Sequence, residues 1–293
     1  MNDKPIVVGY DGSSGAEAAL RWAIEEAGRT GVPIRVVQVV ETPLHVAAVA
    51  PGVGVFPDAE LRRDAEVALA VTVEKVRADN PEVAVTGGVL PEPTVPALLE
   101  QSHRAALVVL GSRGHGGFAG LLLGSVGVAV SGHAHCPVVV VRGTARPAGS
   151  GAPVVVGVDG SPDSLLAAAY GFEQAAEHGV GVEAVHAWTP PAPPWRSTIR
   201  PLALDADELE QAELHLLNAA LAGLRTAYPG VPTRTRVVAG GAAHALVEAS
   251  RTAQLVVVGS RGMGGFRGLL LGSVSQQLLH HADCPVAVIR RDS

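Results

Sequence analysis

The stretch that decides the fold is GSRGHGGFAGLLLGSV at residues 111–126, which returns as GSRGMGGFRGLLLGSV at residues 259–274. Fourteen of the sixteen letters agree, and the second copy begins 148 residues after the first (259 − 111 = 148). The same shift lays Asp11 on Asp159 and Cys136 on Cys284, with no net insertion between them. A match at constant offset along each half predicts two copies of one structural unit. We call the two stretches the glycine ribbons.

The chain is long enough for two domains. Its 293 residues exceed what one core usually needs, and each half is large enough to fold alone. The segment GTARPAGSGA at 143–152 is rich in Gly, Ala and Pro, as linkers are. We therefore predict one domain over residues 1–147 and a second over residues 148–293.

Each half alternates strands with helices. The apolar fourth strands, ALVVL at 106–110 and LVVVG at 255–259, suit the middle of a parallel sheet that helices cover on both faces. Helical spacing of apolar residues predicts the intervening helices. The other predicted strands fall at 5–11, 33–40, 83–90 and 137–142, and at 153–159, 180–188, 233–239 and 285–290. This order predicts an α/β protein with two tandem doubly wound domains, each with a five-stranded parallel sheet.

Composition excludes several classes of partner. The net charge is −6 and Lys and Arg are not clustered, so we expect no nucleic acid and no anionic membrane surface as partner. Residues 114–141 lack charged side chains, but their glycines, and the charged residues at matching places in the second copy, argue against a membrane span. The N-terminal sequence MNDKPIVVGYDGS lacks a secretory signal pattern, so we expect a cytoplasmic protein.

The ribbons lie at the carboxyl end of each fourth strand, where a doubly wound sheet opens its ligand crevice. Glycines at 111, 114 and 124 leave no side chain between backbone N–H groups and a bulky anion. Ser125 and Ser273 then open a helix, whose N-terminus favours phosphate. Each serine either caps its helix or donates its hydroxyl to a phosphate oxygen. Arg113 and Arg261 either pair with phosphate or are solvated loop residues.

Two known phosphate-binding signatures, Walker A and the dinucleotide fingerprint, match this sequence less well than a glycine loop that opens a helix does. Walker A ends in Gly-Lys-Ser/Thr, but the only lysines are Lys4 and Lys75, far from both ribbons. The dinucleotide fingerprint follows a first strand, where this chain has GYDGSSG and GVDGSPD. A purely structural glycine turn remains an alternative.

Asp11 and Asp159 end the first strands and face the same crevice. Each carboxylate could accept a bond from a sugar hydroxyl or hold a metal that bridges phosphates. The alternative is that it caps the first helix, a role for which Ser13 and Ser161 compete. Val39 and Ala187, near the ends of the second strands, could offer backbone groups to a base.

Both halves resemble universal stress protein domains, and the chain resembles the tandem form common in actinobacteria. The specific motif is the ribbon G-x2-G-x9-G-Ser/Thr, which is intact in both copies. The resemblance implies an ATP-binding stress-response regulator, with ATP and its Mg²⁺ as ligand. It implies one site lined by Gly9, Asp11, Val39, Gly111, Arg113, Gly114, Gly124, Ser125 and Val126. The other site would be lined by Gly157, Asp159, Ala187, Gly259, Arg261, Gly262, Gly272, Ser273 and Val274.

The resemblance also implies how the halves associate. Strands 138–141 and 286–289 are expected to pair within the chain and form a pseudo-dimer, and further homodimerisation is expected. The halves depart from one another at His115 and Met263, at Ala119 and Arg267, and at Val40 and Trp188. These differences lead us to expect unequal affinities in the two pockets.

No constellation for fast catalysis is evident. Histidines lie close to each cysteine, in HAHC at 133–136 and in HHADC at 280–284, but their spacing differs between the copies. We therefore interpret them as histidines at helix ends and not as metal ligands. We interpret the two cysteines as reduced, buried and structural. Two alternatives to a regulator remain: an interaction module without nucleotide, and a slow ATP-hydrolysing enzyme. Gly111→Asp combined with Gly259→Asp is expected to abolish nucleotide binding while leaving the fold intact.

Overall fold

The computed structural model describes residues 4–41, 58–114, 124–142, 151–189, 206–264 and 270–291. The chain divides into two compact units, Met1–Gly143 and Thr144–Ser293. The predicted domain boundary between residues 147 and 148 lies within 143–150, outside the described residues. We refer to unit 1 and unit 2 and describe each separately.

Both units have the predicted alternation of strands and helices. Unit 1 contains β1 (Ile6–Gly9), α1 (Ser14–Thr30), β2 (Ile34–Val39), α3 (Asp58–Asp79), β3 (Val85–Leu90), α4 (Thr94–Ser102), β4 (Leu107–Gly111), α5 (Ser125–His133) and β5 (Val138–Val141). Unit 2 contains β6 (Val154–Gly157), α6 (Pro162–His178), β7 (Val182–Trp188), α7 (Ala206–Ala227), β8 (Thr233–Ala239), α8 (Ala242–Ser250), β9 (Leu255–Gly259), α9 (Ser273–His281) and β10 (Val286–Ile289).

The strands of each unit are parallel and follow the same order. In unit 1 the order is β3-β2-β1-β4-β5, and in unit 2 it is β8-β7-β6-β9-β10. The first three strands of each unit are added toward one edge of its sheet, and the last two toward the other edge. The strand order therefore reverses between β1 and β4 in unit 1, and between β6 and β9 in unit 2. The predicted fold class is therefore confirmed. Such a reversal leaves a crevice at the carboxyl ends of the strands, where ligands of doubly wound folds bind.

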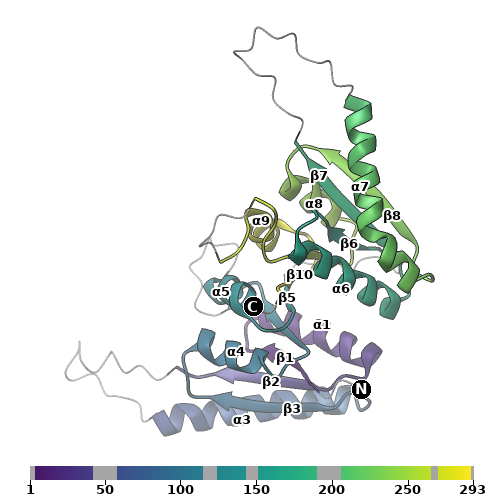
Figure 1. The fold of residues 1–293 in the computed structure, drawn as a ribbon. Helices are drawn as coiled ribbons and strands as arrows, with labels where there is room; N and C mark the ends of the chain where they lie inside the picture. The colour runs from purple at the N-terminus through teal and green to yellow at the C-terminus, as the bar shows by residue number, and fades with distance from the viewer. Residues whose placement is uncertain are drawn as a thin grey trace, which may run out of the picture. The chain divides into compact units, whose positions relative to one another are not determined.

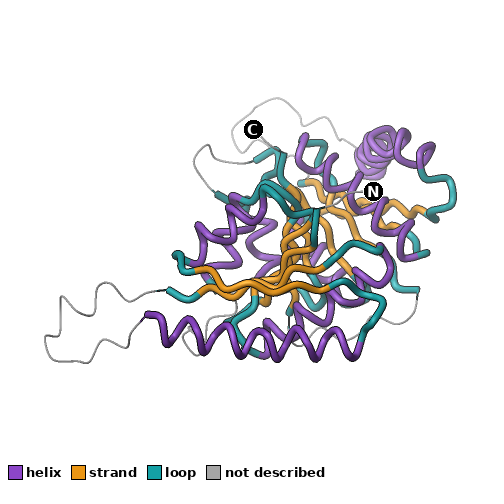
Figure 2. Tube along the Cα trace, turned by 90° about the horizontal axis from the view of Figure 1, so that it is seen from below, coloured by secondary structure: helices purple, strands orange, loops and turns teal. Residues whose placement is uncertain are grey.

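Helices cover both faces of each sheet (Figure 1). In unit 1, α4 and α5 lie on one face and α3 on the other, and the strands run between helical layers in Figure 2. The central strands are accordingly apolar on both faces: Val7, Val8, Val108 and Val109 in unit 1 are all at most 1 % exposed.

The first helix of each unit carries its own start and stop signals. Ser13 caps α1 by accepting a bond from the N–H of Ala16 at 3.2 Å, and Ser161 caps α6 by accepting one from Ser164 at 3.2 Å. Gly31 and Gly179 end these helices in the left-handed conformation, with φ of 70° and 64°, which glycine adopts without steric cost. Of the two residue types that competed for this role, serine and not aspartate is the cap.

No helix among the described residues combines the length and the apolar character that a membrane span requires.

Candidate functional site

Each unit has a cavity at the carboxyl ends of its central strands. In unit 1 the cavity has a volume of about 580 Å³ and contacts β1, β2, β4, α4 and the start of α5. In unit 2 the volume is about 450 Å³ and the corresponding elements line it. Both volumes fall within the range of small-molecule sites.

The structure brings the predicted site residues of each unit together. In unit 1 all nine line one cavity: Gly9, Asp11, Val39, Gly111, Arg113, Gly114, Gly124, Ser125 and Val126. In unit 2 all nine line the other: Gly157, Asp159, Ala187, Gly259, Arg261, Gly262, Gly272, Ser273 and Val274. Residues more than a hundred positions apart thus share a surface because parallel strands end at one edge of a sheet.

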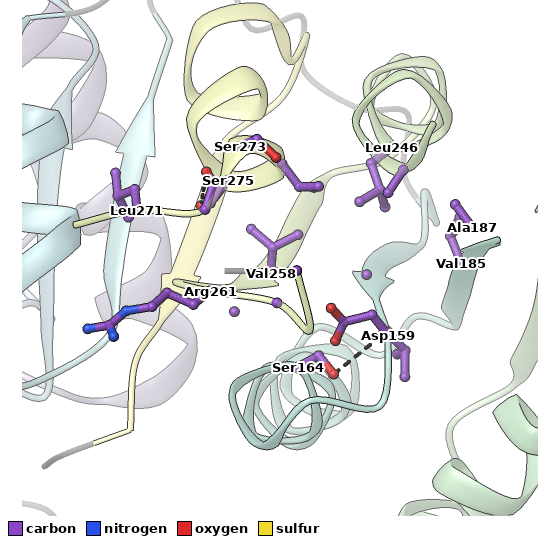
Figure 3. Close-up of a pocket in the computed structure, with 18 residues that line it drawn as sticks. Asp159, Ser164, Val185, Ala187, Leu246, Val258, Arg261, Leu271, Ser273 and Ser275 are labelled. Atoms are coloured by element: carbon purple, nitrogen blue, oxygen red, sulfur yellow. Dashed lines mark hydrogen bonds between the residues drawn. The ribbon is translucent and has the colours of Figure 1, made fainter. Parts of the chain in front are cut away.

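The unit 2 cavity has two chemically different ends (Figure 3). Val185 and Ala187 on β7 and Leu246 on α8 lie at one end and are apolar. Ser273 and Ser275 on α9 lie on the opposite side, next to the ribbon. The arrangement can hold a ligand with a flat apolar part at one end and an anionic part at the other.

Asp159 joins the end of β6 to the ribbon. Its Oδ1 accepts a bond from the Ser161 N–H at 3.0 Å, and its Oδ2 accepts one from the Met263 N–H at 2.8 Å. Burial acts to raise the pKa of Asp159, but the hydrogen bonds from Ser161, Met263 and Ser164 outweigh it and lower that pKa below its usual value. The carboxylate is therefore ionised at neutral pH, and it holds one backbone N–H of the ribbon, that of Met263, and one at the N-cap of α6, that of Ser161.

Asp11 occupies the same position in unit 1. Its Oδ1 accepts a bond from the Ser13 N–H at 3.0 Å. A Cβ added at Gly114 would collide with the carboxylate of Asp11, and one added at Gly262 would collide with that of Asp159. A side chain at the middle glycine of either ribbon would therefore have to displace the carboxylate of the aspartate.

The first glycine of each ribbon serves helix packing. A Cβ at Gly111 would lie 2.6 Å from the carbonyl oxygen of Gly15 in α1, and one at Gly259 would lie 2.8 Å from the carbonyl carbon of Asp163 in α6. Real side chains do not tolerate such contacts with backbone. The expectation that Gly111→Asp and Gly259→Asp leave the fold intact is therefore wrong, because either side chain would push the first helix off the sheet.

The last glycine of each ribbon has room around it. Among the residues that the structure describes, a Cβ at Gly124 would meet nothing closer than the carbonyl oxygen of Ser112 at 3.8 Å, and one at Gly272 would meet nothing closer than 3.5 Å. Their φ angles are −75° and −68°, so the backbone conformation does not require glycine either. Neither the backbone conformation nor packing against the described residues requires glycine at the start of these helices.

Gly124 and Gly272 are the N-caps of α5 and α9, and neither cap makes a side-chain hydrogen bond. Ser125 and Ser273 are the first helical residues rather than caps. The capping alternative for these serines is therefore wrong. The first residues of both helices line the cavities, and no side chain in the described parts of the chain caps these N-termini.

Unit 2 fixes its ribbon with side chains that unit 1 lacks. The Ser275 hydroxyl lies 3.1 Å from the Ser260 carbonyl oxygen and 2.9 Å from that of Gly272, and the Ser260 hydroxyl donates to Asp163 Oδ2 at 3.0 Å. The positions that match Ser275 and Asp163 in unit 1 are Gly127 and Gly15. The two sites therefore have the same backbone plan but unequal support.

Arg113 and Arg261 are exposed at the cavity mouths. In the parts of the chain that the structure describes, neither forms a salt bridge with an acidic side chain. The Arg261 side chain extends away from Asp159 (Figure 3). Both guanidinium groups are free to meet an anion, and the alternatives for these arginines remain open.

Sequence reasoning missed part of the cavity wall. The residues it did not name are Tyr10, Ala16, Val37, Thr94, Leu98, Leu110 and Gly127 in unit 1, and Val158, Ser164, Val185, Ala242, Leu246, Val258, Gly264, Leu271 and Ser275 in unit 2. The first residues of α4 and α8 could have been included, because a helix that follows the third strand of a unit begins at the same edge of the sheet.

The histidine and cysteine sets lie elsewhere. His133 is the last residue of α5, with its Nδ1 2.9 Å from the Ala129 carbonyl oxygen. No group of three or more His, Cys, Asp and Glu side chains among the described residues is arranged to hold a metal ion. Cys284 is buried, whereas Cys136 is only partly buried, which corrects the expectation that both are fully buried.

Comparison with known proteins identifies relatives over nearly the whole chain. The universal stress protein family model matches residues 3–142 and 152–290. A universal stress protein of Mycobacterium tuberculosis H37Rv is 40 % identical over 292 residues, which cover 98 % of this chain and 97 % of that protein. The crystal structure of a universal stress protein from Archaeoglobus fulgidus superposes over 100 % of both chains, with a TM-score of 0.71 and 20 % identity. A universal stress protein solved in complex with cAMP covers 47 % of this chain and 95 % of its own, with a TM-score of 0.37 and 26 % identity.

Proposed function

We propose that this chain, which belongs to the universal stress protein family, is an ATP-binding regulator of a cytoplasmic stress response with one nucleotide site in each unit. The observation that carries the proposal is the open space at Gly124 and Gly272. Each is a helix N-cap at which an added Cβ would meet no described residue closer than 3.5 Å, yet both copies have glycine there.

The phosphate tail is assigned to the ribbon end of each cavity. There the first N–H groups of α5 or α9 and the partial positive charge of the helix start attract an anion. Ser125 and Ser273, as first helical residues, can donate their hydroxyls to phosphate oxygens. Arg113 and Arg261 lie at the mouth, where a guanidinium can pair with phosphate.

The nucleoside is assigned to the opposite end. Val39 and Leu98 in unit 1, and Ala187 and Leu246 in unit 2, form apolar walls suited to a base. Asp11 and Asp159 lie between the two ends. Although Asp159 already accepts two backbone bonds, each carboxylate oxygen has a second lone pair for a ribose hydroxyl.

We expect Mg²⁺ to bind in these cavities only together with the nucleotide. Among the described residues that line each cavity there is one carboxylate, Asp11 or Asp159, and Mg²⁺ is commonly held by one or two carboxylates together with substrate phosphates and water. We therefore propose that Mg²⁺ enters with ATP, neutralises phosphate charge and is held mainly by phosphate oxygens.

Binding rather than turnover is the proposed activity. Asp159 is the acidic side chain at the unit 2 cavity, and hydrogen bonds that lower its pKa make it a weak base. Occupancy would act by stabilising one conformation of the chain over another, which a partner then reads. Incubation with ATP and Mg²⁺ should release neither phosphate nor pyrophosphate at a steady rate above background.

The decisive experiment is titration calorimetry with ATP and Mg²⁺ on four proteins: the natural chain, Gly124→Asp, Gly272→Asp and the double variant. Aspartate is a favoured N-cap, so the fold should hold, while its carboxylate takes the place of the phosphate. We expect each single variant to lose one site and the double variant to lose both. Gly124→Asn and Gly272→Asn are the matched controls, because asparagine caps equally well without the charge.

An absence of ATP binding by the natural chain would refute the proposal. Equal loss with aspartate and asparagine would show that bulk, and not charge, blocks the site.

We further propose that β5 and β10 pair edge to edge within the chain and that two chains form a homodimer. Both strands are short and wholly buried, VVVV and VAVI, and an apolar strand edge that stayed open would invite aggregation. Sedimentation equilibrium would report the homodimer, and uniform protection of β5 and β10 amides from hydrogen exchange would support the pairing.

A further inference from the structure

At the nucleoside end of the unit 1 cavity, a lining threonine is hydrogen-bonded to an exposed glutamate, a pair that unit 2 lacks. Thr94, the first residue of α4, lines this cavity together with Val39 and Leu98. Glu41 stands two residues after the end of β2, and its Oε1 lies 2.9 Å from the Thr94 backbone nitrogen and 2.7 Å from the Thr94 hydroxyl oxygen. The Pro93 N-cap has no side-chain bond, so Glu41 supplies the capping acceptor for α4.

Unit 2 cannot form this pair. The positions that match Glu41 and Thr94 are Thr189 and Ala242. Ala242 lines the unit 2 cavity as the first residue of α8, but it has no side-chain donor or acceptor. The two cavities therefore differ in polarity at the end that receives the base.

The chemistry of the pair fixes the direction of its hydrogen bond. Bonds from the Thr94 backbone and hydroxyl lower the pKa of Glu41, so its carboxylate is ionised at neutral pH. An ionised carboxylate only accepts, so the Thr94 hydroxyl must donate its single proton to Glu41. The Thr94 oxygen then has only lone pairs left for any other partner.

We propose that Thr94, oriented by Glu41, makes the unit 1 site select a base that presents an exocyclic amino group, as adenine does, over one that presents a carbonyl, as guanine does. The inference rests on the proposed nucleotide function and assigns it a specificity residue. The N6 amino group of adenine can donate to the Thr94 oxygen, whereas guanine O6 would place an acceptor against an acceptor. Glu41 is a positioning residue, because it acts through Thr94.

The test measures base selection one site at a time. Full-length chain with Gly272→Asp leaves only unit 1 to titrate with ATP and with GTP, each with Mg²⁺. We expect Thr94→Val to reduce the preference for ATP over GTP by about tenfold, the value of roughly one hydrogen bond. Thr94→Ser keeps the hydroxyl and should keep the preference. Glu41→Gln should also reduce it, because a neutral amide no longer fixes the direction of the threonine proton.

The reciprocal design installs the pair in unit 2. In a chain with Gly124→Asp, which leaves only unit 2, Ala242→Thr together with Thr189→Glu should raise the preference for ATP over GTP. Ala242→Thr alone should raise it less, because its hydroxyl proton is free to turn toward a guanine carbonyl.

Equal weakening of ATP and GTP by Thr94→Val would overturn the inference, since Thr94 would then only shape the wall. An unchanged preference with tight ATP binding would also overturn it while leaving the proposed function standing. Failure of the natural chain to bind any of ATP, GTP or cAMP would remove the proposed function itself, and with it this inference.

Discussion

The backbone N–H of Met263 donates a 2.8 Å hydrogen bond to Oδ2 of Asp159, which ties the glycine ribbon of unit 2 to the end of its first strand. The other oxygen of the same carboxylate accepts from Ser161, at the N-cap of α6. One side chain thus positions two loops that border the cavity.

Asp159→Asn should lower the free energy of unfolding by about 1 kcal/mol at pH 7, because a neutral amide accepts with one oxygen only and its NH₂ faces a donor. The pKa of Asp159 is lower in the folded chain than in the unfolded chain. Its stabilisation is therefore present above the unfolded pKa of about 3.9 and is lost as the pH falls through the lowered folded value.

Urea unfolding at pH 7 and at pH 3 checks this prediction, with the gap between Asp159→Asn and the natural chain shrinking at pH 3. Asp79→Asn, at the exposed end of α3, is the control and should change stability by less than about 0.5 kcal/mol at either pH. A gap that stays constant with pH would contradict the role of the carboxylate charge.

Gly111→Ala should destabilise unit 1 by about 1–3 kcal/mol, because its new methyl group would lie 2.6 Å from the carbonyl oxygen of Gly15 and force α1 away from β4. Gly124→Ser is the matched control in the same ribbon, where no described residue lies closer than 3.8 Å to an added Cβ and serine is a favoured cap. Thermal unfolding measures both. Equal melting temperatures for the two variants would show that α1 does not pack as closely as described.

Ser275→Ala should weaken ATP binding in unit 2 by about three- to tenfold, because the ribbon loses its hydroxyl bond to the Ser260 and Gly272 carbonyl oxygens. Calorimetry in the Gly124→Asp background isolates this site. Ser131→Ala is the matched control: its hydroxyl is buried, and no partner for it is found in the described parts of the chain. That variant should leave ATP binding unchanged and match or exceed the natural stability, since it removes an unsatisfied buried group.

Cys284 should resist thiol reagents in the folded protein, because burial raises the pKa of its thiol to about 12 and excludes the reagent. Cys136 is only partly buried and should react first. Mass spectrometry after brief labelling at pH 8 distinguishes them, with Cys136→Ser as the control that should remove the fast phase. Faster modification of Cys284 would contradict its burial.

The order of elements and the position of the ribbons could be read from the sequence. Hydrophobic periodicity is a local property, so the apolar runs at 106–110 and 255–259 indicated central strands without knowledge of their neighbours. The repeat then placed every landmark of unit 2 from its counterpart in unit 1. Parallel strands end at one edge, which is why the eighteen predicted site residues share two cavities.

What each residue does in its cavity depended on contacts between segments distant in sequence. Gly111 and Gly124 are both glycines of one ribbon, and the sequence does not distinguish their roles. Only the tertiary structure shows that Gly111 makes room for α1, whereas Gly124 has space around it among the described residues. The bond between Glu41 and Thr94 spans 53 positions, so no local pattern predicted it. Periodicity and repeats reside in the order of residues and so determined the two-unit fold, whereas the role of each glycine, cap and polar pair was decided by which atoms long-range packing brings within a few ångströms.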